Sequence, residues 1–130
     1  MKFSEFYISN HEGKSNCVIR TFCKMFGEEY NDVYNDLCSI AKRLDCDSFN
    51  DIDVFETYMK ERDTNKIDYG KDIKIKDLIL DNGSYAVFCW DKKDYYHMVL
   101  IIDNVLYDKN DASLEMYTIT IYKNNINKIN

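Results

Sequence analysis

The apolar residues of this chain change from a helical spacing in the first half to a strand-like spacing in the second half. Up to about residue 61 they recur every three or four positions, which predicts three amphipathic helices. After Asn82-Gly83 they form short β-rich runs, and the last run alternates apolar and polar residues as a half-exposed strand does. This order predicts an α+β fold, with N-terminal helices packed on a C-terminal antiparallel sheet.

Local signals set the expected boundaries of these elements. The first helix, 16–26, has Ser15 or Asn16 as its cap and Gly27 as a left-handed stop. The other expected elements are helices at 31–44 and 51–61 and strands at 84–90, 95–102, 105–107 and 114–122. The polar stretch 62–71 is predicted to be a loop, and 73–80 is compatible with a strand leading into a short helical turn.

The length of 130 residues suits one domain and is too short for two independent cores. We expect a single domain over 1–122, followed by a polar, Asn/Lys-rich tail over 123–130. No apolar run approaches the roughly 20 residues that a membrane-spanning helix needs. Glu5 interrupts the segment where a secretion signal would be apolar. We therefore expect a cytoplasmic protein with no membrane partner.

Charge and cysteine spacing exclude several classes of partner. The net charge is -6 and the lysines are interleaved with acidic residues, so a basic surface for nucleic acid is not expected. Five cysteines cannot all pair, no Cys-x-x-Cys is present, and the two histidines are far apart. A disulfide framework and a structural zinc site are therefore not expected. Without a Gly-rich phosphate loop, we expect no cofactor and no metal.

Cys17 is the cysteine best placed for chemistry. It falls at the first or second position of the first predicted helix, where free backbone N–H groups and the helix dipole favour a thiolate. The other four cysteines are expected within helices, in an acidic loop or in a strand. Because purely structural cysteines also occupy helix starts, Cys17 is a candidate nucleophile that requires a partner base.

A predicted hairpin supplies that base. His97 begins the strongest β run of the chain, and Asp103-Asn104 suits a two-residue turn because both side chains tolerate left-handed backbone. In that register His97 lies opposite Asn110 and diagonal to Asp108, so the three side chains share one face. Asp108, or alternatively Asn110, is expected to orient the imidazole as the third member of a Cys-His-Asp/Asn set. A slip of one residue would remove Asp108 from this face.

A thiol nucleophile also needs hydrogen-bond donors for the oxyanion that forms on the attacked carbonyl. The backbone N–H of Cys17 at the helix start is one natural donor. The second is expected from the loop before Cys17, where Asn10, His11 and Asn16 are the candidates and the sequence does not choose among them. His11 is equally compatible with a surface position.

The order of these residues resembles that of papain-like cysteine peptidases. The segments 15–20 (SNCVIR), 27–34 (GEEYNDVY) and 97–108 (HMVLIIDNVLYD) are similar to a group of small bacterial and phage proteins of that fold. The resemblance covers about residues 10–110, and its motifs are short. It implies a papain-like core, with Cys17 as nucleophile, His97 as general base and Asp108 as orienting residue, in the cytosol of a bacterium or phage-infected host.

Two positions depart from the papain-like pattern, and both bear on the oxyanion site. The Gly that often follows the nucleophile is Val18 in this chain. The Gln that commonly stands about six residues before the nucleophile is replaced by His11, with Asn10 beside it. The resemblance therefore supports the Cys17–His97 pair more directly than it supports any particular oxyanion donor.

The leading functional hypothesis is a cysteine hydrolase, either a peptidase or an amidase, that acts through a thioester on Cys17. Its substrate or target is expected to be a peptide or protein. One alternative is a papain-like binding module without catalysis, such as a phage-encoded inhibitor of a host protein, because acidity and many tyrosines suit an interaction surface. Another is acyl transfer or deamidation at the same Cys17. The sequence does not determine the oligomeric state.

Overall fold

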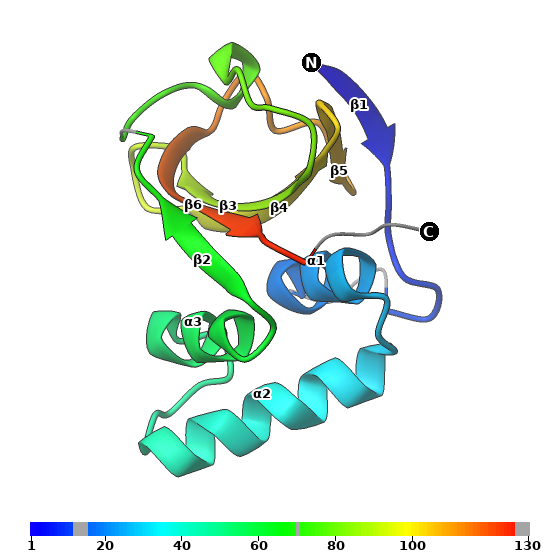
Figure 1. The fold of residues 1–130 in the computed structure, drawn as a ribbon, viewed down its shortest axis with the longest axis vertical. Coiled ribbons are helices and arrows are strands. Elements are labelled where there is room, and N and C mark those ends of the chain that lie inside the picture. The colour runs from blue at the N-terminus through cyan, green and yellow to red at the C-terminus, as the bar shows by residue number, and fades with distance from the viewer. Residues whose placement is uncertain (12–15, 70, 127–130) are drawn as a thin grey trace.

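The computed structural model describes residues 1–11, 16–69 and 71–126. Over these residues the chain forms an α+β fold with three α-helices, one 3-10 helix and a six-stranded mixed sheet. The elements are β1 (Lys2–Glu5), α1 (Cys17–Phe26), α2 (Tyr30–Leu44), α3 (Ile52–Lys60), β2 (Thr64–Ile67), η1 (Ile75–Asp77), β3 (Ser84–Trp90), β4 (Tyr96–Ile102), β5 (Val105–Asp108) and β6 (Tyr117–Asn124). Figure 1 shows the α-helices on one side of a strongly curved sheet, with α1 between the sheet and α2.

The three predicted helices are confirmed, each within one residue of its expected bounds. Gly27 ends α1 as expected, because its φ of 66° is left-handed and its N–H donates to the carbonyl of Cys23. The prediction that Asn16 caps the helix is wrong for its side chain, which makes no capping hydrogen bond. The other predicted cap, Ser15, lies outside the described residues.

The predicted β4–β5 hairpin is also confirmed. Ile102 pairs with Val105, and the antiparallel register continues to Leu100 opposite Tyr107. The turn residues Asp103 and Asn104 have φ angles of 48° and 65°, which is the backbone that a tight two-residue hairpin requires. This register places the side chains of His97 and Asp108 on the same face of the sheet.

The sheet is mixed, which corrects the prediction of a purely antiparallel one. Its order is β1-β5-β4-β3-β6-β2, and β1 runs parallel to β5. The sequence pattern missed β1, and it assigned β2 to a loop. Both are short edge strands in which polar or charged residues predominate, so main-chain pairing stabilises them and no apolar alternation marks them. Residue 70 of the predicted loop lies outside the described residues.

The last strand differs from its prediction at both ends. It begins at Tyr117, not at residue 114, and it continues through Lys123 and Asn124, two residues beyond the expected end of the ordered domain. Asn124 pairs with Thr64 of β2, so pairing with β2 extends the strand into polar sequence. Residues 127–130 of the predicted tail lie outside the described residues.

Apolar clusters cover both faces of the central strands. On the helix side, α1 packs on β4 through side chains that include Val18, Ile19, Phe22, Met98 and Leu100. The opposite cluster includes Val99, Ile101, Leu106, Ile75 and Leu78. Each fully buried side chain of this size contributes about 1.5–3 kcal/mol to folding. The start of α1 and the start of β4 are therefore held firmly against each other.

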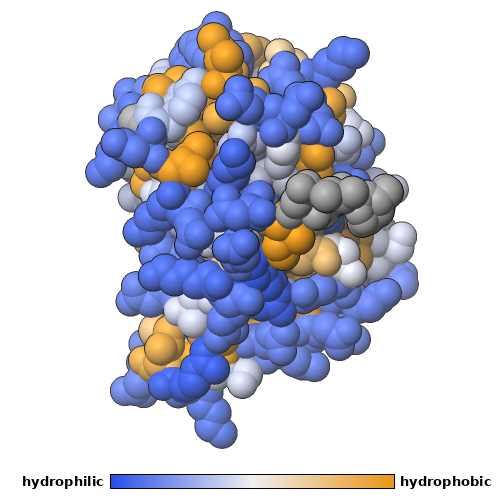
Figure 2. Space-filling view, viewed as in Figure 1, coloured by the Kyte–Doolittle hydropathy of each residue, from blue (hydrophilic) through white to orange (hydrophobic). Residues whose placement is uncertain are grey.

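One face of the molecule can be followed in a space-filling view (Figure 2). The face in Figure 2 is largely hydrophilic, with several separate apolar patches. Among the described residues, no helix combines the length and apolar character needed to cross a bilayer.

Candidate active site

Cys17 is the first residue of α1 and is partly buried against the sheet. Its sulfur hydrogen-bonds to the side chain of His97 and to the backbone N–H of Met98. Burial disfavours the thiolate, but these hydrogen bonds and the positive charges of His97 and Arg20 outweigh that penalty. The pKa of Cys17 is therefore lowered from the ordinary value of 9.0, which makes this thiol easier to ionise.

His97 is the second residue of β4 and is only 9% exposed. Its Nε2 lies 2.6 Å from Oδ2 of Asp108, which leaves Nδ1 to face Cys17. Burial opposes protonation of the imidazole, but the hydrogen bonds and charges of Asp108 and Cys17 raise the pKa of His97 from 6.5 to about 9. The opposite pKa changes of Cys17 and His97 favour a thiolate beside an imidazolium.

Asp108 is the last residue of β5 and is 3% exposed. One carboxylate oxygen contacts His97. The other accepts hydrogen bonds from Nη2 of Arg20 at 2.8 Å and from the N–H of Lys109 at 2.8 Å. The carboxylate is therefore held by partners on both of its oxygens, and its orientation toward the imidazole is fixed.

Arg20 is a buried member of the site that the sequence pattern did not identify. The residue is 7% exposed, and its guanidinium joins Oδ1 of Asp108 to Oδ1 of Asn16, the latter at 2.9 Å. The available signal was a cationic residue one helical turn after Cys17 on a helix whose neighbouring positions are apolar. A charge buried in this way requires paired partners, so Arg20 ties the start of α1 to the end of β5.

The predicted oxyanion donors have other contacts. Asn16 is buried, and its amide donates to the carbonyl of His11 at 3.0 Å while it accepts from Arg20. The ring of His11 stacks on Tyr30 with centroids 3.7 Å apart. Asn10 is exposed with a left-handed φ of 70°. Asn16 therefore belongs to the polar network beside Cys17, while the ring of His11 lies against Tyr30.

Asn110 does not take the place that the hairpin register predicted for it. The strand β5 ends at Asp108, and Asn110 is exposed beyond that end. The chain stops pairing with β4 at the point where the carboxylate of Asp108 accepts a hydrogen bond from the N–H of Lys109. Of the two candidates for the third position, the structure brings Asp108 to His97.

Two further residues contact His97 directly. Tyr95 stacks on the imidazole with ring centroids 5.6 Å apart, and its hydroxyl lies 3.3 Å from Nδ1. The sequence contained a signal for this contact, because residues two apart in extended chain point to the same side. Cys89 pairs with His97 across β3 and β4 and donates from its sulfur to the carbonyl of His97 at 3.5 Å.

The environment of Cys17 differs from that of the other buried thiols. Burial raises the pKa of Cys23 to about 11 and raises the pKa of Cys89 well above the ordinary value. Both thiols are therefore held in the neutral form, which is the state of a small buried hydrophobe. Cys17 is the cysteine whose surroundings favour the reactive form.

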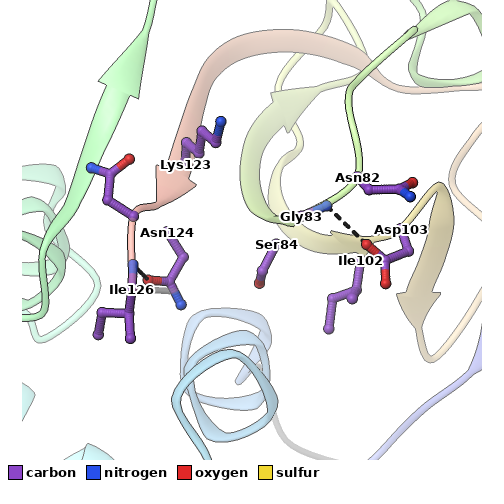
Figure 3. Close-up of a pocket in the computed structure, with 9 residues that line it drawn as sticks. Asn82, Gly83, Ser84, Ile102, Asp103, Lys123, Asn124 and Ile126 are labelled. Carbon is purple, nitrogen blue, oxygen red and sulfur yellow. Dashed lines mark hydrogen bonds between the residues drawn. The ribbon is translucent and has the colours of Figure 1, made fainter. Parts of the chain in front are cut away.

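One cavity of the described structure lies away from these residues. It has a volume of about 610 Å³ and includes Ser84, Ile102, Asp103 and Asn124 in its lining. Figure 3 shows these side chains around a space near α1, with the N–H of Gly83 donating to Asp103. Ser84 pairs with Ile102 at the opposite end of β3 and β4 from His97. This cavity is therefore separate from the Cys17 site.

In the described part of the chain, no group of three or more His, Cys, Asp or Glu side chains is arranged to hold a metal ion. The Cys17 site brings together a thiol, an imidazole and a carboxylate, which are the group types of a Cys-His-Asp set. Comparison of the chain with protein-family models, with curated proteins and with solved structures gives no match.

Proposed function

We propose that the protein is a cysteine hydrolase with a papain-like core, in which Cys17 is the nucleophile, His97 the general base and Asp108 the residue that orients His97. The observation that carries the proposal is the continuous buried chain of contacts from Cys17 through His97 to Asp108, in which the pKa of the thiol is lowered and that of the imidazole is raised. These shifts supply the ion pair that thiol catalysis needs.

In the first half-reaction the thiolate of Cys17 attacks an acyl carbon of the substrate. The backbone N–H groups at the start of α1 stabilise the resulting oxyanion, because the first N–H groups of a helix lack intrahelical partners. The carbon–leaving-group bond then breaks, and Nδ1 of His97 delivers its proton to the leaving amine or alcohol. The products are a thioester on Cys17 and a neutral imidazole.

In the second half-reaction water attacks the thioester carbon and gives a proton to Nδ1. The carbon–sulfur bond breaks, the acid product leaves, and the thiolate–imidazolium pair is restored. We propose peptide or protein amides, isopeptides or esters as the substrate class. The half-exposed aromatic side chain beside the site, Tyr95, suits contact with an extended peptide.

The test is labelling with a thiol-reactive peptide electrophile, followed by mass mapping of the modified cysteine. Cys17 of the wild type should react faster than in His97→Ala, because the hydrogen bond and charge of the imidazole lower the pKa of the thiol and so raise the thiolate fraction near neutral pH. His11→Ala, which changes the other histidine of the chain, is the matched control and should react at the wild-type rate. Equal rates in all three proteins would refute the activated pair.

A binding module without catalysis is the second candidate. The observations that favour it are the net charge of -6 and the exposed tyrosines Tyr7, Tyr34, Tyr95 and Tyr96, since tyrosine-rich surfaces are common at protein interfaces. This function becomes the leading one if Cys17 reacts no faster than an ordinary thiol. If Cys17 is activated, product analysis with water and with added amines separates hydrolysis or deamidation from acyl transfer.

A further inference from the structure

Tyr95 is held in place by a structured turn between β3 and β4. The carboxylate of Asp91 accepts hydrogen bonds from three backbone N–H groups, those of Lys93 at 2.9 Å, Asp94 at 3.2 Å and Tyr95 at 3.2 Å. The N–H of Asp91 also donates to the carbonyl of Tyr95 at 3.2 Å. Hydrogen bonds on both sides of its peptide therefore fix the backbone from which the Tyr95 side chain extends over His97.

The side chain of Tyr95 occupies the solvent side of the imidazole. Its ring lies within 23° of parallel to the His97 ring, and its hydroxyl is 3.3 Å from Nδ1, the nitrogen that also faces Cys17. Tyr95 is 55% exposed. Partial burial and the nearby charge of Cys17 raise the pKa of Tyr95, so its hydroxyl retains the proton that it needs to act as a donor.

The hydrogen-bond requirements of His97 change when Cys17 is acylated. In the resting ion pair, Nδ1–H donates to the thiolate, and Nε2–H donates to Asp108. After the proton has passed to the leaving group, Nδ1 is a bare acceptor, and the sulfur has become part of a thioester, which has no proton to donate. Asp108 still accepts from Nε2–H, but Nδ1 requires a new donor to keep the ring in place.

We propose that Tyr95 is a positioning residue for the second half-reaction, in which its hydroxyl donates to Nδ1 of His97 while Cys17 carries the acyl group. This inference rests on the cysteine hydrolase function proposed above. The hydroxyl holds the neutral imidazole beside the thioester. It then gives up its hydrogen bond to Nδ1, so that this nitrogen can accept a proton from the attacking water. As the water oxygen bonds to the acyl carbon, its proton passes to Nδ1 and the carbon–sulfur bond breaks.

The experiment follows both half-reactions with p-nitrophenyl acetate as the probe. Release of nitrophenolate reports acylation, and intact mass spectrometry reports the lifetime of the acetyl group on Cys17. Tyr95→Phe keeps the stacked ring and removes only the hydroxyl. It should leave the acylation rate within about twofold of the wild type and slow the loss of the acetyl group by about two- to tenfold, which is the effect of one lost hydrogen bond.

Tyr96→Phe is the matched control, because Tyr96 is also about half exposed but points to the other face of β4, where it stacks on Phe88 and Trp90. It should match the wild type in both half-reactions. The inference is overturned if Tyr95→Phe loses the acetyl group at the wild-type rate, or if it slows acylation as much as deacylation. If the wild type acquires no more acetyl group than Cys17→Ala, the proposed hydrolase function itself fails, and the inference fails with it.

Discussion

At the scale of single residues, the reactivity of Cys17 depends on a balance between burial and neighbouring charge. Burial alone would raise the pKa of the thiol, as it does for Cys89. At Cys17 the hydrogen bond and charge of His97 reverse the direction of the change. Both sulfurs contact the same histidine, Cys17 at the side chain and Cys89 at the backbone carbonyl. Only the contact with the ionisable ring favours a thiolate.

The first prediction concerns the pH dependence of Cys17 alkylation by iodoacetamide. In the wild type, the midpoint of the rate profile should lie below the ordinary thiol value of 9.0, because the imidazolium stabilises the thiolate. In His97→Ala the hydrogen bond and charge of the imidazole are lost while burial remains, so the midpoint should lie at a higher pH than in the wild type. In His11→Ala the midpoint should not move. Coincident profiles for the wild type and His97→Ala would contradict the prediction.

At the scale of secondary-structure elements, the site depends on how α1 is joined to the β4–β5 hairpin. Apolar contacts from Ile19 and Phe22 press α1 onto β4, but they do not set its orientation along the strand. The buried Arg20 adds directional contacts, since it reaches Asp108 at the end of β5 from one helical turn after Cys17. One ion pair therefore positions both the start of α1, where Cys17 lies, and the carboxylate of Asp108.

The second prediction is that Arg20→Met lowers the free energy of unfolding by about 3–5 kcal/mol, because it breaks a buried ion pair and leaves Oδ1 of Asp108 without its guanidinium partner. The matched control is Arg43→Met. Arg43 pairs with Glu61 at 3.0 Å, but both side chains are about half exposed, so the expected loss is only about 0–1 kcal/mol. Urea denaturation measures both variants. Equal losses would show that the Arg20 pair has no special structural role.

At the scale of the whole molecule, the ion pair affects how stability varies with pH. The raised pKa of His97 means that the folded protein holds a proton there between 6.5 and about 9, while the unfolded chain does not. By itself this makes stability fall as pH rises through that window. The lowered pKa of Cys17 has the opposite effect, because the folded thiol has lost a proton that the unfolded thiol still holds below 9.0. The two effects on stability cancel where the pH lies above the lowered pKa of Cys17 and within the window between 6.5 and about 9.

The third prediction follows from this cancellation. In Cys17→Ala only His97 remains, with its pKa still raised by Asp108 but no longer by Cys17, so the free energy of unfolding should fall by up to about 1.4 kcal/mol per pH unit as pH rises from 6.5 to the pKa that His97 has in this variant. The wild type should show a flatter curve over the same interval. Cys23→Ala, which removes another buried thiol, should parallel the wild type. Urea denaturation at a series of pH values measures all three, and parallel curves for the wild type and Cys17→Ala would refute the proton balance.

Much of this architecture could be predicted from local sequence. The three helices follow from apolar spacing, and Gly27 ends the first because its backbone is left-handed. The hairpin follows from the tolerance of Asp103 and Asn104 for positive φ. From that register, the sequence alone predicted that His97 and Asp108 would share a face. These features depend on residues close together along the chain, where backbone geometry and side-chain period are the controlling factors.

Other features were decided only by the tertiary structure. The strands β1 and β2 form because an open sheet edge accepts main-chain hydrogen bonds from nearly any exposed segment. Choosing Asp108 over Asn110 required knowing where β5 ends. Arg20 is a site residue because packing of α1 buries it beside a carboxylate 88 positions away. The sequence by itself determined which local elements form and that Cys17 begins a helix. Contacts distant along the chain decided which side chains meet Cys17, because burial and pairing of charges depend on the completed packing.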